Sequence, residues 1–156
     1  MNKNRKIVMV TTVLVLLLSL LAACGAKATP APDTETIPKP SNPGGPGEAV
    51  NLTGNATTGA QVFADNCASC HGDQGKTGIA NPGSADGTVP PLNPIDEALV
   101  NADAKTFATN IDLFIEHGST PEGSSPTQLM TAFGDKKLLT SQQIADVIAY
   151  VISLNK

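Results

Sequence analysis

Hydrophobic residues recur with a helical period in two stretches of the chain's second half. The first covers about 57–70, where positions spaced by four, four and three residues share one face, namely Gly59, Phe63, Cys67 and Cys70. The second covers about 103–117, and its stripe consists of Phe107, Ile111, Phe114 and Ile115. Gly118 follows it as a residue typical of a helix end. Both stretches are predicted to be amphipathic helices.

A third helix is predicted near the C-terminus, because Thr140 and Gln143 have the spacing of a capping box. An apolar face follows, made of Ile144, Val147, Ile148, Val151 and Ile152. The segments 72–94 and 118–128 are rich in glycine and proline and are predicted to be loops. No stretch is a convincing strand, so the sequence predicts an all-α fold of about three main helices with long loops. Only five aromatic residues are available, and we expect a large flat group to complete the core.

The N-terminus has the pattern of a signal peptide over residues 1–23. Three basic residues (Lys3, Arg5 and Lys6) precede an uncharged apolar run over 7–23. The run ends in "LAAC", which resembles the lipobox of bacterial lipoproteins, in which the cysteine receives a diacylglyceryl group and the signal is cut before it. The resemblance implies lipidation at Cys24. The alternative is an uncleaved transmembrane anchor in which Cys24 is incidental. Either interpretation places the rest of the chain outside the cytoplasm.

Residues 24–50 begin with Cys24 and continue as a linker without hydrophobic periodicity that holds six of the twelve prolines. The folded domain is predicted over residues 51–156. From Cys24 onward the chain has seven lysines and fourteen acidic residues, a net charge of −7. This charge argues against nucleic acid as a partner and against binding anionic lipid through a basic face.

The candidate chemistry lies in "CASCH", residues 67–71, which has the C-x-x-C-H spacing of covalent haem attachment. Cysteines three residues apart on a helical turn reach the two vinyl groups at one porphyrin edge, and His71 then lies under the iron. Three other interpretations are weaker. A redox dithiol requires a βαβ context, a zinc site would need His117 beside Cys67, Cys70 and His71, and a disulfide within one turn is sterically poor.

A haem iron has a second axial position, which is either filled by the protein or open for chemistry. Met130 is the only methionine that remains after removal of the signal, and it precedes the last helix. It is therefore the candidate distal ligand, although a methionine of this kind can also be a core residue. His117 is the rival ligand, but its place in the last turn of a helix is explained by the helix dipole alone.

These residues together resemble a small class I cytochrome c over about 55–156. Gly59, Phe63 and Tyr150 match the positions where the family's first and last helices meet. Cys67, Cys70 and His71 match the haem motif, and Met130, followed by "AFG" at 132–134, matches the distal ligand. The "PPL" of Pro90, Pro91 and Leu92 resembles the segment around the haem in which a proline carbonyl accepts the proximal histidine's proton.

The resemblance implies one covalently bound haem c with His71 and Met130 as axial ligands. Both faces of such an iron are occupied, so the function it implies is electron transport and not catalysis. We expect a carrier held by its lipid at the outer face of the bacterial cytoplasmic membrane. In the family's context, a quinol-oxidising complex is the donor and a terminal oxidase the acceptor. The alternative is a haem enzyme or sensor with a labile distal ligand, which would be peroxidase-like or would bind gases.

Overall fold

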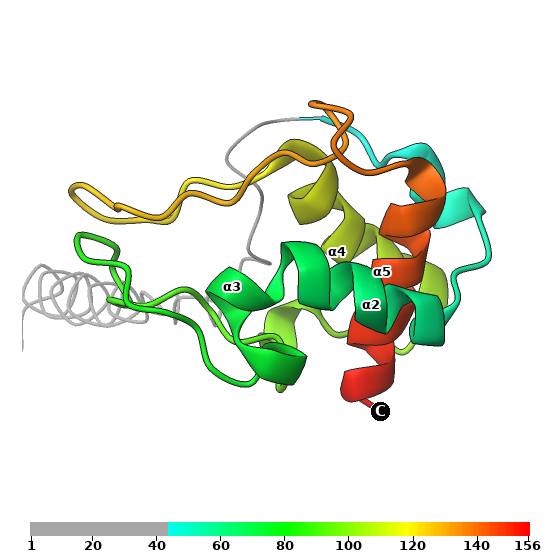
Figure 1. The fold of residues 1–156 in the computed structure, drawn as a ribbon, viewed down its shortest axis with the longest axis horizontal. Helices are drawn as coiled ribbons and strands as arrows, with labels where there is room; N and C mark the ends of the chain where they lie inside the picture. The colour runs from blue at the N-terminus through cyan, green and yellow to red at the C-terminus, as the bar shows by residue number, and fades with distance from the viewer. Residues whose placement is uncertain (1–43) are drawn as a thin grey trace, which may run out of the picture. The chain divides into compact units, whose positions relative to one another are not determined.

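The computed structural model describes residues 44–156, and the predicted signal peptide and Cys24 lie outside this range. Its three main helices are α2 (Ala56–Asn66), α4 (Ala104–His117) and α5 (Ser141–Leu154) (Figure 1). Four short helical segments accompany them: η2 (Glu48–Asn51), α3 (Ala68–His71), η3 (Asp73–Gly75) and η4 (Glu97–Leu99). Residues 44–156 form no sheet, only two isolated β-bridges, which confirms the all-α prediction. None of the helices in this range is long and apolar enough to cross a membrane.

Helices α2 and α5 pack closely because glycine stands at their crossing. A Cβ atom added to Gly59 would lie 1.9 Å from the carbonyl oxygen of Asp146, so any side chain would push the helices apart. Beside this crossing, the rings of Phe63 and Tyr150 meet edge to face with their centroids 5.3 Å apart. The contact predicted among Gly59, Phe63 and Tyr150 is therefore present.

The ends of the helices are capped by the residues that the sequence offers. Thr140 and Gln143 form the predicted capping box at the start of α5. The Asn55 side chain caps α2 by accepting hydrogen bonds from the backbone N–H groups of Thr57 and Thr58. The Asn55 backbone N–H in turn donates to Asp146 Oδ1 at 2.8 Å, which fixes the start of α2 against α5.

The core lies among α2, α4 and α5 and includes the predicted apolar faces of α4 and α5. Its buried members are Ala49, Val62, Phe63, Ile95, Leu99, Phe107, Ile111, Ile115, Leu139, Ile144, Ala145, Val147, Ile148 and Val151. Ala49 belongs to η2, before the predicted boundary at residue 51. Within the segment that its prolines and lack of periodicity assigned to the linker, Ala49 is buried and the Gly47 N–H donates to Asp112.

The first predicted helix, over 57–70, is divided at Cys67. Helix α2 ends at Asn66, and Cys67 has φ −116° and ψ −34° before α3 begins at Ala68. The Asn66 side chain bonds back to the carbonyl of Val62 at 2.9 Å, inside α2. Periodicity alone did not predict the division, because the residues on both sides keep helical spacing.

Candidate haem site

The turn from Cys67 to His71 gathers the three residues of the predicted attachment motif. The Cys67 carbonyl accepts hydrogen bonds from the N–H groups of Cys70, at 3.1 Å, and His71, at 3.0 Å. Both cysteines and His71 are half-buried, and neither cysteine forms a disulfide. The two thiols are thus presented from one tight turn, as attachment to one edge of a porphyrin requires.

His71 is oriented by a backbone carbonyl. Its Nδ1 lies 2.9 Å from the carbonyl oxygen of Pro90, which is the candidate acceptor that the structure selects over Pro91. A carbonyl oxygen only accepts, so Nδ1 carries the proton and the lone pair of Nε2 is left for a metal. Burial lowers the pKa of His71, although the bond to Pro90 opposes this shift. The neutral, iron-binding form of the imidazole is thereby favoured.

The thiol environment disfavours redox chemistry of the cysteine pair. Burial, together with the neighbouring Cys70, raises the pKa of the Cys67 thiol to about 11. Reactive dithiols require the opposite shift, because the thiolate is their nucleophile. The zinc interpretation has no support either, since within residues 44–156 no three histidine, cysteine or acidic side chains are gathered to hold a metal ion.

Met130 lies on the loop that follows α4. Its N–H donates to the Ser119 carbonyl at 2.8 Å, and the Ser119 N–H donates back to the Met130 carbonyl at 3.2 Å. Gly118, with φ +70°, permits this close pairing, since a Cβ there would lie 2.5 Å from the Met130 carbonyl oxygen. The Met130 side chain is half-buried and packs at the edge of the core.

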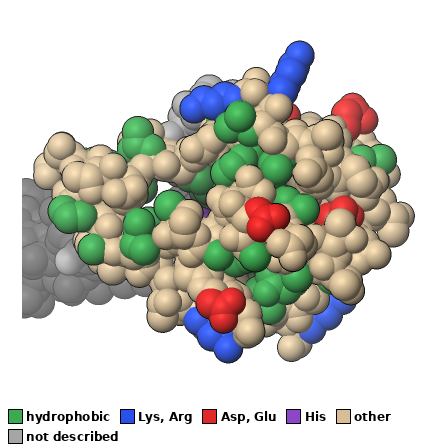
Figure 2. Space-filling view, in the orientation of Figure 1, with side chains coloured by type: hydrophobic (Ala, Val, Ile, Leu, Met, Phe, Trp, Pro, Cys, Tyr) green, Lys and Arg blue, Asp and Glu red, His purple; other side chains and the backbone are tan. Residues whose placement is uncertain are grey.

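The surroundings suit a large flat group. Figure 2 shows an opening between the extended loops and the helical body, with hydrophobic side chains at its edges. Several half-buried hydrophobic residues border the core without being covered by it, among them Cys67, Ala68, Leu92, Met130 and Phe133. Leu92 is held near the attachment turn by its N–H, which donates to the Gly75 carbonyl at 2.7 Å. The two thiols, the oriented imidazole and the apolar surroundings suit a covalently attached haem.

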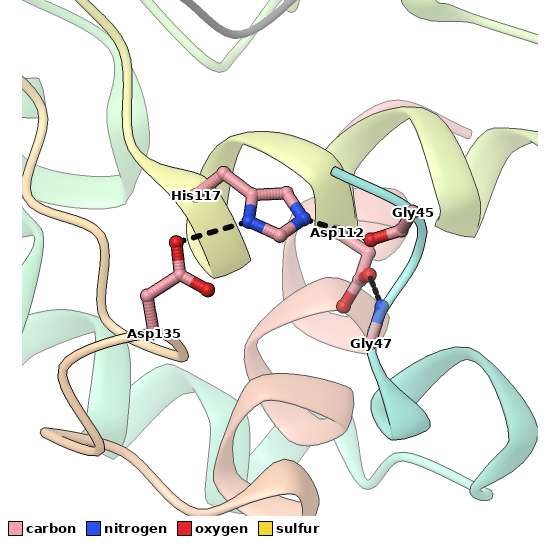
Figure 3. Close-up of polar contacts among 5 residues, drawn as sticks. All are labelled: Gly45, Gly47, Asp112, His117 and Asp135. Carbon is pink, nitrogen blue, oxygen red and sulfur yellow. Dashed lines mark hydrogen bonds and ion pairs between the residues drawn. The ribbon is translucent and has the colours of Figure 1, made fainter. Parts of the chain in front are cut away.

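His117 lies in the last turn of α4, as expected, and its ring also connects distant parts of the chain. Nε2 lies 2.8 Å from the carbonyl oxygen of Gly45, and Nδ1 lies 3.0 Å from Asp135 Oδ2 (Figure 3). Nearby on the same helix, the buried Asp112 accepts a hydrogen bond from the Gly47 N–H. His117 therefore connects the end of α4 to the start of the described chain and to the loop after Met130. With both ring nitrogens bonded to oxygens of the protein, it is not arranged as an iron ligand.

Sequence reasoning missed Asn81, which is 0% exposed and hydrogen-bonds across to residues 127 and 128. It also missed Asp112, another polar residue that is 0% exposed. A single polar residue inside a loop or a helix has no periodicity. For Asn81 the only available signal was a polar side chain in a loop rich in glycine and proline. For Asp112 it was a polar side chain next to an apolar stripe.

The helices, the attachment turn and the oriented histidine define a c-type cytochrome domain. The cytochrome c family model matches residues 56–155, and the chain belongs to that family. The family and the Cys67–Cys70 pair together imply one covalently bound haem c, as the sequence predicted.

Among curated proteins, the chain resembles a subunit of a cytochrome c oxidase. It is 38% identical over 101 residues to the Cbb3-type cytochrome c oxidase subunit CcoP of Rhodobacter capsulatus, covering 64% of this chain and 29% of that protein. A second CcoP sequence from Rhodobacter capsulatus is 35% identical over 101 residues, with the same coverage. The chain thus spans less than a third of the length of these relatives. No solved structure matches it significantly.

Proposed function

We propose that His71 and Met130 are the axial ligands of the haem iron and that the protein is an electron carrier, not an enzyme. The observation that carries this proposal is the bond from His71 Nδ1 to the Pro90 carbonyl, 2.9 Å long, next to the two attachment cysteines. This bond leaves Nε2 for the iron and fixes the plane of the ring. Met130 is supported as the distal ligand because its backbone is paired with Ser119 and its half-buried side chain packs against the core, in the same group of partly buried residues as Cys67 and Leu92.

A bound haem would supply one-electron oxidation and reduction, and the residues of the chain would limit any other reaction. Cys67, Cys70 and His71 would hold the haem, and Met130 would exclude water and substrates from its iron. Thioether ligation also raises the reduction potential. Fixed ligands and apolar surroundings keep structural change between the two oxidation states small, which is what a carrier requires.

The proposed setting is the outer face of the bacterial cytoplasmic membrane, with a diacylglyceryl group on Cys24 as the anchor. The donor would be a quinol-oxidising complex and the acceptor a terminal oxidase. The acceptor is supported by the likeness to CcoP, whose name identifies it as a subunit of a cytochrome c oxidase. Two acyl chains would give stable attachment, whereas one would be marginal.

The ligand assignment is tested by three variants of the haem-loaded protein. Met130→Ala is expected to remove the far-red absorption band that reports methionine–iron bonding in cytochromes c and to lower the reduction potential. Leu129→Ala is the matched control, because Leu129 is the neighbouring residue and its side chain is 60% exposed. His117→Ala is expected to keep the band. Loss of the band in His117→Ala with retention in Met130→Ala would overturn the assignment.

The anchor is tested separately from the haem. Cys24→Ala is expected to leave haem attachment intact while the protein moves from the membrane fraction to the soluble fraction, or remains unprocessed. If the variant is processed and membrane-bound like the parent, the lipidation proposal is wrong. If the parent protein is found in the membrane fraction but its mass shows no added lipid, the interpretation as an uncleaved transmembrane anchor replaces the lipidation proposal.

A further inference from the structure

Two long loops of the domain lie side by side and are joined by hydrogen bonds (Figure 1). We name the pair, residues 79–89 and 119–130, the two-loop lobe. Across it, the Ala85 N–H donates to the Glu122 carbonyl at 2.7 Å, and the Ser125 N–H donates to the Gly83 carbonyl at 3.2 Å. The first loop continues from the haem-attachment turn, and the second ends at Met130. Whatever joins the loops therefore also connects the two sides of the proposed haem site.

Asn81 makes the most buried connection within the lobe. Its side chain is 0% exposed, and Oδ1 accepts hydrogen bonds from the N–H groups of Thr127, at 3.0 Å, and Gln128, at 2.8 Å. Its Nδ2 donates to the Gln128 carbonyl at 3.0 Å. One amide thus uses both its acceptor and its donor on two consecutive residues of the other loop. Only a side chain with both functions at this length forms all three bonds.

Asn81 is itself fixed to its own loop and, through it, to the attachment turn. Its backbone N–H donates to the Gly87 carbonyl at 2.8 Å, and the Ser84 hydroxyl donates to its carbonyl at 2.8 Å. Two residues earlier, the Ile79 N–H donates to the Cys70 carbonyl at 3.0 Å. The position of Asn81 therefore follows the position of Cys70.

On the other loop, the residue that Asn81 holds is two positions before the proposed ligand. Gln128 is fixed by Asn81, and Met130 is paired with Ser119. Between them Leu129 is 60% exposed, so little packing holds this residue in place. The segment that ends at Met130 is thus held by Ser119 and by the first loop of the lobe. The contacts of its backbone to that loop are the three Asn81 side-chain bonds and one bond from the Thr127 N–H to the Pro82 carbonyl, 3.2 Å long.

We infer that Asn81 is a positioning residue that sets the Met130 segment relative to the Cys67–His71 turn and so keeps the sulfur on the iron. This inference rests on the proposed Met130 ligation. Without the amide, the Gln128 N–H and the Gln128 carbonyl lose their partner, and the Thr127 N–H keeps only its 3.2 Å bond to the Pro82 carbonyl, so the loop opens more often. One buried hydrogen bond changes the equilibrium between the closed and the open loop roughly fivefold. The variant loses more than one bond, but neighbouring bonds do not add fully, so we expect the open population to grow at least about tenfold.

The test uses the oxidised, haem-loaded protein and two readouts. Imidazole competes with the methionine for the iron, so its affinity reports how often Met130 is displaced. For Asn81→Ala we expect imidazole to bind at least about tenfold more tightly than to the parent. We also expect hydrogen exchange to accelerate at the Gln128 amide, and less at the Thr127 amide, which keeps its bond to the Pro82 carbonyl. The matched control is Asn110→Ala, because Asn110 is half-buried and its amide donates to the Leu99 carbonyl at 2.9 Å, joining α4 to η4 and not to the two-loop lobe.

The outcomes separate this inference from the proposed function. Parent-like imidazole affinity in Asn81→Ala overturns the inference, as does an equal change in Asn110→Ala. Absence of the far-red band in the parent itself overturns the proposed ligation, and with it the inference, before any variant is made. If Asn81→Ala does not fold, Asn81→Asp takes its place: its protonated acid can still donate to Gln128, whereas its carboxylate cannot. Imidazole affinity should then rise with pH more steeply than in the parent, and an equal slope contradicts the inference.

Discussion

The bonds of His117 make a prediction with a defined pH dependence. Its two nitrogens face the Gly45 carbonyl oxygen and the Asp135 carboxylate, neither of which donates a hydrogen (Figure 3). Both bonds form only when both ring nitrogens carry protons, that is, in the imidazolium. The Gly45 bond first, and then Asp135, raise the pKa of His117 above 6.5. The other charged groups near the ring are Glu116 and Asp112 on its own helix.

The free energy that His117 contributes can be estimated from the exposure of the side chains that form its two bonds. The His117 side chain is 12% exposed, so its bond to Gly45 is worth about 1–1.5 kcal/mol. The Asp135 side chain is 49% exposed, and screening by solvent limits its contribution to about 0.5–1 kcal/mol. We therefore expect His117→Ala to lower the free energy of unfolding by about 2 kcal/mol when the imidazole is protonated.

The stabilisation by His117 is expected to decrease as the pH rises. A histidine whose pKa is raised by folding gives its full stabilisation below the pKa of the unfolded chain, about 6.5, and loses it as the pH rises through the raised folded value. The neutral His117 ring carries one N–H group, so it can donate only one of its two hydrogen bonds. The cost of His117→Ala is thus expected to fall to about 1 kcal/mol at high pH. Urea unfolding of parent and variant at about pH 6 and about pH 9 measures both costs.

Two adjacent glycines provide controls. A Cβ at Gly44 would lie 2.2 Å from His117 Nε2, whereas a Cβ at Gly45 meets nothing within 4 Å. Gly44→Ala should therefore lower stability and weaken its pH dependence as His117→Ala does, and Gly45→Ala should not. The reasoning is refuted if His117→Ala costs the same at both pH values, or if the two glycine variants behave alike.

Two further predictions concern packing and a buried acid. Gly59→Ala places a Cβ 1.9 Å from the Asp146 carbonyl oxygen and should lower the free energy of unfolding by about 1–3 kcal/mol or more, measured in urea; an unchanged midpoint would contradict the close crossing. Asp112 is buried, and within residues 44–156 its Oδ1 has no hydrogen-bond partner. Burial raises the pKa of its carboxyl, so ionisation costs stability above that pKa. Asp112→Asn should consequently keep or raise stability at neutral pH, whereas Asp112→Ala, which leaves the Gly47 N–H without an acceptor, should lower it by about 1–2 kcal/mol.

The sequence was sufficient to predict those structural features that depend on a local repeat or on a fixed spacing of residues. The capping box of Thr140 and Gln143 begins α5 as predicted, and Gly59, Phe63 and Tyr150 meet at the helix crossing. The capping box has a local spacing that is visible in a short window, and the attachment turn was predictable for the same reason, since its residues are adjacent. The contact of Gly59 and Phe63 with Tyr150 was implied by the resemblance to the cytochrome c family.

The features that escaped prediction depend on contacts between distant segments. His117 bonds to a carbonyl 72 residues away in the sequence, and Asn81 to backbone groups 46 and 47 residues away. A backbone carbonyl is offered by every residue, so nothing in the sequence marks Gly45 or Gln128 as a partner. The division of the first helix at Cys67 and the burial of Ala49 were missed for a similar reason. Composition describes a segment by itself, whereas these features depend on what it packs against.

The central claim is that both axial positions of the haem iron are occupied by the protein, as a carrier requires. The most direct measurement is carbon monoxide binding to the reduced, haem-loaded parent, followed in its visible spectrum. With His71 and Met130 on the iron, we expect the spectrum to remain unchanged on addition of carbon monoxide, while Met130→Ala binds it readily. Rapid, stoichiometric binding to the parent would contradict the account and would favour a haem enzyme or gas sensor with an open distal side.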